Sequence, residues 1–237
     1  MRATASLLRF TVELDGIAVL VADAGCGKSM LLGELADELQ HDGWVVHYFA
    51  HSTVGPFSLI NVLARKAGIV PKRSRGETAM LLTDQLVADE RKHLLVLDEA
   101  HELPDDTIED VRLLTITDFD RKSPFLLLLA GHPSLDDRLA EPTHHALDQR
   151  ITTLARLAPL SLDETRDYLA CRLQCAGAGK NPVFDEGAVD AIFDAAGGIP
   201  RRINNVATAS LIVTASRGRR IVNEQDVHDA RLDRGRS

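Results

Sequence analysis

The chain has 237 residues, of which 45% are hydrophobic and 4% aromatic, and its formal net charge is -8 at neutral pH. This length and composition predict a globular protein with one large domain, or a domain with a small appendage. The negative charge excludes a protein whose whole surface binds nucleic acid, because such binding depends on phosphate neutralisation by Lys and Arg. Any DNA contact must therefore come from a local basic patch.

The N-terminal region predicts neither a signal peptide nor a membrane span. In residues 1–16 the charged residues Arg9, Glu13 and Asp15 lie between the apolar ones, unlike in a signal peptide. No run of about 18 apolar residues, long enough to span a membrane, occurs in the chain. We therefore expect a cytoplasmic protein with no membrane partner. The three cysteines are too few for a disulfide framework, and no nearby His or Cys completes a zinc site.

The first predicted elements are a strand, a loop and a helix. Residues 17–22, IAVLVA, form a short apolar run rich in β-branched side chains, and residues 28–40 repeat leucines at helical spacing. The loop between them fits the phosphate-binding pattern G-x-x-x-x-G-K-[ST], except that Ala22 replaces the first glycine. An alanine there costs about 1 to 2 kcal/mol only if a left-handed backbone is required, so we expect weakened or unaffected binding.

Each residue type in this loop suits a nucleotide phosphate. Gly25 and Gly27 let backbone N–H groups approach the anion at a helix N-terminus, Lys28 supplies positive charge, and the Ser29 hydroxyl suits Mg²⁺. The residues predicted to bind ATP are Asp23, Ala24, Gly25, Cys26, Gly27, Lys28, Ser29, Met30 and Asp98.

Residues 65–75, RKAGIVPKRSR, contain five basic residues and no acidic one. We expect Lys72, Arg73 and Arg75 to be the best candidate DNA contacts, with the arginine-rich C-terminal end second. A solvated loop and a frayed tail are the alternative interpretations.

Further strands are predicted at residues 44–50, 93–98, 124–130 and 151–157. Each is a short apolar run separated from the next by a longer segment, which is typical of strands buried on both faces of a parallel sheet. The sequence therefore predicts a doubly wound α/β domain.

Asp98 and Glu99 follow the apolar run LLVL, so they should lie at the carboxyl edge of the sheet, where ligands bind in such folds. Asp98 would hold Mg²⁺, and Glu99 would orient or deprotonate the attacking water. A zinc protease is excluded, because the pattern H-E-x-x-H that begins at His101 has Asp105 in place of its second histidine.

Three further side chains are candidates for contacting the phosphates. His132 ends the run LLLLAG, Arg150 precedes residues 151–157, and Arg201 follows GGIP together with Arg202. Guanidinium groups stabilise charge on a transferring phosphoryl group. The alternatives are a helix-capping loop histidine and surface arginines that are ion-paired or solvated.

The region after residue 158 predicts a helical domain. SLDE at 161–164 is a capping box, Asp185 is a candidate N-cap, a helix is expected from about 201 to 217, and a last helix should begin near Asn223. We expect two domains, an α/β nucleotide-binding domain over 1–158 and a helical lid over 159–237.

Together these motifs resemble the AAA+ ATPases, with GCGKS as Walker A and LLVLDE as Walker B. The resemblance places His132 at sensor 1, Arg150 at the arginine finger and GGIPR at sensor 2. Within the AAA+ ATPases, the sequence most resembles the ExeA-like branch, named for general secretion pathway protein A. This branch includes ATP-dependent helpers of transposases. Four stretches carry that more specific match: VLDEAHEL, VRLLTITDFDRKSPFLLLLAGHPSL, ALDQRI and GGIPRRINN.

The resemblance implies a P-loop parallel-sheet core, an α-helical lid, and catalytic roles for Glu99, His132, Arg150 and Arg201. It implies that Arg150 acts on the nucleotide of an adjacent subunit, that Arg201 rather than Arg202 is the sensor 2 residue, and that ATP drives assembly into rings or filaments. The chain departs from the branch at Ala22, at His132 and in a shorter segment before the phosphate loop. Secretion members continue into a transmembrane segment, so the end of this chain after the lid favours a transposition helper.

Our main hypothesis is a Mg²⁺-dependent ATPase that forms a homo-oligomer, binds double-stranded DNA in its ATP state and recruits or regulates a transposase. The alternatives are an ATP-gated interaction module with little hydrolysis and a secretion-type ATPase of the same branch. A small P-loop kinase is disfavoured by the Asp98–Glu99 pair and by the helical lid.

Overall fold

The computed structural model describes residues 16–50, 56–115, 123–179 and 182–234. The chain divides into two compact units. The first comprises residues up to Asp23 and Lys28–Leu157, and the second comprises Ala24–Gly27 and the chain from Ala158 onward. In the described residues no helix is both long and apolar enough to cross a lipid bilayer.

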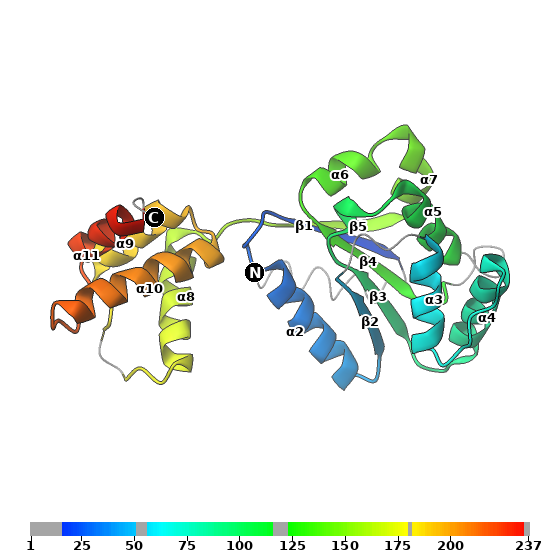
Figure 1. Ribbon diagram of the computed structural model, residues 1–237, viewed down its shortest axis with the longest axis horizontal. Coiled ribbons are helices and arrows are strands. Elements are labelled where there is room, and N and C mark those ends of the chain that lie inside the picture. The colour runs from blue at the N-terminus through cyan, green and yellow to red at the C-terminus, as the bar shows by residue number, and fades with distance from the viewer. Residues whose placement is uncertain (1–15, 51–55, 116–122, 180–181, 235–237) are drawn as a thin grey trace. The chain divides into compact units, whose positions relative to one another are not determined.

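The N-terminal unit is a parallel sheet wrapped by helices (Figure 1). Its strands are β1 (Ile17–Ala22), β2 (Val45–Phe49), β3 (His93–Leu97), β4 (Leu126–Gly131) and β5 (Ile151–Leu157). Its α-helices are α2 (Lys28–His41), α3 (Pro56–Lys66), α4 (Arg75–Ala88), α5 (Asp105–Leu114), α6 (Ser134–Leu139) and α7 (His145–Asp148). Two short 3-10 helices, η1 (Ala100–Glu102) and η3 (Pro142–His144), complete it.

The strand order is β2-β3-β4-β1-β5, and every pair is parallel. This order puts the carboxyl ends of all the strands at one edge of the sheet. Because only β4 separates β1 from β3, the loop after β1 and the loop after β3 lie near each other at that edge. The sequence-predicted strands are confirmed, each to within two residues at either end.

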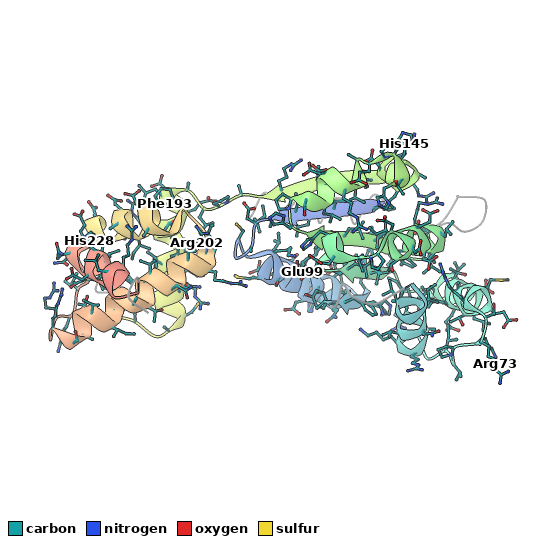
Figure 2. All side chains as sticks on the ribbon, turned by 45° about the horizontal axis from the view of Figure 1, so that its top comes forward. Arg73, Glu99, His145, Phe193, Arg202 and His228 are labelled. Carbon is teal, nitrogen blue, oxygen red and sulfur yellow. The ribbon has the colours of Figure 1, made fainter. Side chains whose placement is uncertain are left out.

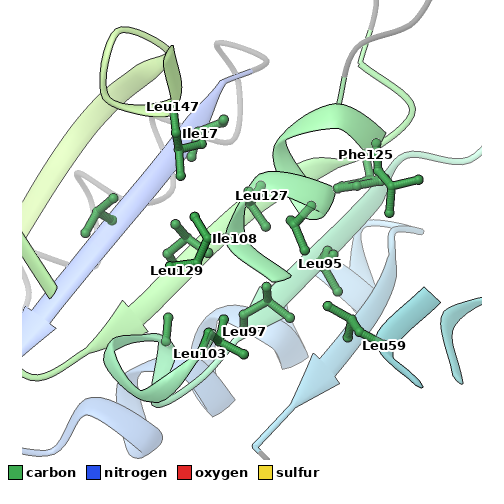
Figure 3. Packing of buried hydrophobic residues seen from close by; sticks show 14 of the residues in the cluster. Ile17, Leu59, Leu95, Leu97, Leu103, Ile108, Phe125, Leu127, Leu129 and Leu147 are labelled. Carbon is green, nitrogen blue, oxygen red and sulfur yellow. The ribbon is translucent and has the colours of Figure 1, made fainter. Parts of the chain in front are cut away.

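Helices cover both faces of this sheet, as its buried strands require. Leu59 of α3 and Ile108 of α5 pack on Leu95, Leu97 and their neighbours on one face (Figure 3). The opposite face receives α2, which buries Leu31, Leu32, Leu35 and Leu39 and contacts β1 and β2. The strands β1, β3 and β4 are therefore buried along their whole length.

The C-terminal unit contains the helices α8 (Leu162–Cys175), α9 (Glu186–Ala196), α10 (Pro200–Ser216) and α11 (Glu224–Arg234). The predicted capping box is present, since the Ser161 hydroxyl accepts from Glu164 N and the Glu164 carboxylate accepts from Ser161 N. The Asp185 carboxylate accepts from Ala188 N at 2.7 Å and caps α9. These local signals explain why the sequence located the helix starts well.

Gly198 closes the turn between α9 and α10. Its φ is 71°, Leu160 N donates to its carbonyl oxygen at 2.8 Å, and a Cβ at this position would collide with Leu160 O. The neighbouring Gly197 also has a positive φ, of 60°, but a Cβ there meets nothing within 4 Å. A substitution at Gly197 would therefore introduce backbone strain alone, whereas one at Gly198 would introduce both backbone strain and a steric collision.

We predict that Gly198→Ala lowers the free energy of unfolding by about 2 to 4 kcal/mol, because it combines a left-handed backbone with a backbone collision. Gly197→Ala should cost only about 1 kcal/mol, since it adds the left-handed strain alone. Urea unfolding followed by helical circular dichroism measures both values. Equal losses in the two variants would contradict the collision with Leu160.

Candidate nucleotide-binding site

The centre of the site is a cluster of three charged side chains at the carboxyl edge of the sheet. Lys28, the first residue of α2, places Nζ 2.7 Å from Asp98 Oδ1 and 2.9 Å from Glu99 Oε1. Lys28 and Asp98 are largely buried, with side-chain exposures of 11% and 4%, whereas Glu99 is 46% exposed. The structure thus brings together the lysine and both carboxylates that the two sequence motifs supplied.

The Asp98 carboxylate is held from two further directions. Glu99 N donates to Oδ1 at 2.8 Å, and the Tyr48 hydroxyl at the end of β2 donates to Oδ2 at 2.8 Å. Partial burial, followed by the hydrogen bond to Asp98, raises the pKa of Tyr48 to about 12. Sequence reasoning missed Tyr48, although the strand pattern WVVHYFA already placed it beside the same edge.

Glu99 has a strained backbone. Its φ and ψ are 54° and 36°, which makes it the one non-glycine residue with positive φ in the part of the chain that the structure describes. Such a conformation costs on the order of 1 to 3 kcal/mol and persists only where the surroundings enforce it. Here the turn from β3 into η1 enforces it and turns the Glu99 side chain toward Lys28.

The loop before Lys28 has the backbone that a phosphate loop needs. Gly25 and Gly27 have φ values of 89° and 99°, a region that glycine enters readily. Cys26 between them is buried, while Asp23, Ala24, Ser29 and Met30 are exposed. Successive N–H groups in such a turn at a helix N-terminus form an anion-binding concavity.

Ala22 is the last residue of β1 and pairs with Leu157 of β5. It is 4% exposed and its φ is not positive. The left-handed backbone that would penalise an alanine is therefore not required here, and the departure from the glycine pattern carries no strain.

His132 follows β4 and lies near the charged cluster. Its Nε2 is 3.7 Å from Asp23 Oδ1, and its ring centroid is 5.9 Å from that of His101. His101 connects this pair to the cluster, since its Nδ1 lies 3.5 Å from Glu99 Oε2 and accepts from His132 N at 3.4 Å. His132 is thus linked to Glu99 through His101, a residue to which the sequence assigned no role.

Arg150 lies at the opposite edge of the sheet. It precedes β5 and lines a cleft of about 510 Å³ with Trp44, His93 and Phe125, which stand at or just before the amino ends of β2, β3 and β4. A strand of this length spans about 20 Å, so the side chain cannot reach the Lys28 cluster of its own chain. Any contact of Arg150 with a nucleotide must be with that of another copy.

The candidate DNA residues differ in their surroundings. The side chains of Lys72 and Arg73 are exposed on the segment between α3 and α4, but Arg75 is ion-paired with the buried carboxylate of Asp110 on α5. Figure 2 shows Arg73 well separated from Glu99 on the N-terminal unit. Of the three, Lys72 and Arg73 remain the better placed for DNA.

Arg201 is the second residue of α10 in the C-terminal unit, and its side chain is exposed. In the same unit its backbone N donates to Gly25 O at 3.2 Å. The basic stretch at the end of α10 is partly neutralised, because Arg217 and Arg219 both bind the fully buried Asp226. Arg220 is exposed and is the remaining described cation of that stretch.

A family model described as an AAA domain matches residues 12–139. This match covers β1 to β4, the phosphate loop and the Asp98–Glu99 pair, but ends before β5. The chain belongs to the AAA domain family. As an AAA protein it has the P-loop parallel sheet and C-terminal helices expected from the sequence, and the resemblance to AAA+ ATPases is confirmed.

Among curated proteins, this AAA chain is 28% identical over 217 residues to general secretion pathway protein A of Aeromonas hydrophila. The alignment covers 90% of the chain but 39% of that relative. Among solved structures, Cdc6p of Pyrobaculum aerophilum aligns over 96% of the chain and 64% of its own, with a TM-score of 0.73 and 24% identity. The ORC1 protein of Aeropyrum pernix, solved in complex with DNA, aligns over 98% of the chain and 63% of its own, with a TM-score of 0.62 and 19% identity.

We predict that Ala22→Gly changes the affinity for an ATP analogue less than about twofold, because Ala22 has an ordinary strand backbone. Isothermal titration with both proteins measures this. A more than tenfold gain in affinity, roughly 1.4 kcal/mol, would show that alanine strains the loop.

Proposed function

We propose that this AAA protein binds ATP with Mg²⁺ and hydrolyses it to ADP and phosphate, slowly unless DNA or assembly stimulates it. The observation that supports this most is the convergence of Lys28, Asp98 and Glu99 at the carboxyl edge of the sheet, with Lys28 directly after the glycines Gly25 and Gly27 in the chain. That edge is where open parallel sheets bind ligands. The residues that bind the nucleotide are then the loop residues Asp23, Ala24, Gly25, Cys26, Gly27, Lys28, Ser29 and Met30, together with Asp98.

The side chains have separate tasks in this proposal. The Ser29 hydroxyl and the Asp98 carboxylate are hard oxygen donors that suit Mg²⁺, which offsets phosphate charge when it is bound. Lys28 contacts the phosphates as a point charge. Glu99, half exposed, accepts the proton of the attacking water.

Three further residues complete the proposed machinery. His132 contacts the terminal phosphate or the water from beside Glu99, and Arg201 contacts the phosphates from the start of α10. Arg150 acts on the nucleotide of a neighbouring copy, which fits its place at the amino edge of the sheet. The proposal therefore includes a homo-oligomer, either a ring or a filament.

We further propose that the partner is double-stranded DNA and that the client is a transposase, which would place the activity in the cytoplasm. Lys72 and Arg73 offer an exposed basic surface on a protein of net charge -8. The ORC1 structure in complex with DNA is a precedent for DNA binding by a protein of this fold. A secretion role is the alternative, because of the identity to general secretion pathway protein A; a transposase gene beside this one would favour transposition.

A second candidate function is an ATP-gated interaction module with little hydrolysis. The observation in its favour is that Glu99 Oε1 lies 2.9 Å from Lys28 Nζ and Oε2 lies 3.5 Å from His101 Nδ1. A carboxylate bound to an ammonium must be released before it can accept a proton from water. Slow turnover would follow if that release is rare.

We predict that Glu99→Gln lowers the rate of phosphate release at least about 100-fold while ATP binding is retained, because an amide cannot accept the proton of water. A phosphate-release assay with and without DNA measures the rate, and titration with ATP measures binding. Glu102→Gln is the matched control, since Glu102 lies on the adjacent η1 and is 62% exposed.

Equal, slow rates in the wild type and in Glu99→Gln, with ATP still driving oligomerisation, would favour the interaction module over the ATPase. If Glu102→Gln lowers the rate of phosphate release as much as Glu99→Gln does, the loss in Glu99→Gln cannot be attributed to removal of the general base.

We predict that reversing both charges, with Lys72→Glu and Arg73→Glu, weakens DNA binding for every sequence tested. Two lost phosphate contacts should reduce the slope of log affinity against log salt by roughly two. Gel shifts with a slowly hydrolysed ATP analogue measure this, and Arg220→Glu tests the C-terminal patch in the same assay. Arg75 is left unchanged, because reversing it would leave Asp110 buried beside a like charge. Equal DNA affinity with and without nucleotide would contradict coupling to ATP.

A further inference from the structure

Tyr48 makes a polar contact in the site that no sequence motif assigns. Its hydroxyl donates to Asp98 Oδ2 at 2.8 Å from β2, the strand at the end of the sheet next to β3. We propose that Tyr48 is a positioning residue, which fixes the Asp98 carboxylate in the orientation that Mg²⁺ binding requires. This inference rests on the proposed nucleotide function.

The geometry leaves the Asp98 carboxylate little freedom. Its Oδ1 faces Lys28 Nζ at 2.7 Å and accepts from Glu99 N at 2.8 Å, while Oδ2 accepts from Tyr48. Partners on both oxygens prevent rotation of the carboxylate about its last bond. The Tyr48 hydroxyl supplies the restraint on the Oδ2 side, and it is neutral, so it restrains the group without competing with a cation for its charge.

Backbone pairing between β2 and β3 fixes the position of the Tyr48 side chain. Tyr48 pairs with Val96 of β3, and the ladder continues to Asp98, whose N donates to Phe49 O at 2.8 Å. On the other side Lys66 Nζ donates to Tyr48 O at 3.3 Å and lies 4.5 Å from the centroid of the Phe49 ring. Strand register thus brings the hydroxyl to Asp98, and Lys66 secures the end of β2.

The Tyr48 hydroxyl is a suitable hydrogen-bond donor for the Asp98 carboxylate. A phenol hydroxyl carries its proton at neutral pH, so it can donate to the Asp98 carboxylate. Tyr48 is 41% exposed, so replacing tyrosine by phenylalanine removes the hydroxyl without opening a buried cavity. The hydrogen bond can therefore be deleted alone.

The test compares the affinity for a slowly hydrolysed ATP analogue in Mg²⁺ and in EDTA, for the wild type and Tyr48→Phe. We expect the Mg²⁺-dependent gain in affinity to fall about fivefold in Tyr48→Phe, while the affinity in EDTA stays within twofold, because a hydrogen bond to a charged acceptor is lost. Tyr168→Phe is the matched control, since Tyr168 is the other tyrosine of the chain and its hydroxyl bonds Asn204 in the C-terminal unit.

A second pair of variants tests whether the effect passes through Asp98. In an Asp98→Asn background, Tyr48→Phe should have no further effect on the Mg²⁺ dependence, because the two residues act through one contact. Thermal unfolding of each variant reports whether the fold is retained.

The outcomes distinguish a failure of the proposed nucleotide function from a failure of the role of Tyr48. No nucleotide binding by the wild type would overturn the proposed function together with this inference. Wild-type binding that depends on Mg²⁺ to the same degree in Tyr48→Phe would overturn the role of Tyr48 alone. Equal losses in Mg²⁺ and EDTA, or additive effects with Asp98→Asn, would also overturn it, since they would mean a general structural role.

Discussion

The contact on which the site depends is the Lys28 ammonium between Asp98 and Glu99. Lys28 and Asp98 are largely buried, and a buried charge is costly unless it is paired. The parallel sheet makes the pairing possible, because it brings the residues after β1 and after β3 to one edge with only β4 between them. Phosphate binding and the release of Glu99 then become one exchange of partners on Lys28, so a nucleotide that arrives also frees the proposed base.

The two edges of the sheet give the chain two different roles in the proposed assembly. Lys28, Asp98 and Glu99 gather at the carboxyl edge, and Arg150 stands at the amino edge beside the cleft with Trp44. Since one chain cannot bring both to the same phosphate, a complete site of this kind needs two copies packed with opposite edges together. In the proposed assembly, hydrolysis would then depend on contact between copies.

The sequence predicted what local patterns determine. Short apolar runs located the strands, Ser161 and Asp185 located two helix starts, and the order of motifs identified the family. It did not find the Tyr48 hydrogen bond, the Arg75–Asp110 ion pair or the link through His101, because strand register and helix packing bring these partners together from distant parts of the chain. The question of Ala22 also needed the structure, since its answer depends on a backbone angle.

The basic segment 65–75 contacts β2, the strand whose Tyr48 also contacts Asp98 in the nucleotide site. At its start Lys66 binds the Tyr48 carbonyl, and at its end Arg75 binds Asp110 of α5, so the segment is anchored on two sides. The backbone between is also fixed, as Lys72 N donates to Thr78 Oγ1 at 2.9 Å. Lys66 thus connects the start of this segment to β2, whose Tyr48 hydroxyl donates to Asp98. In the proposed function, β2 is therefore the element whose movement would couple DNA binding to the nucleotide site.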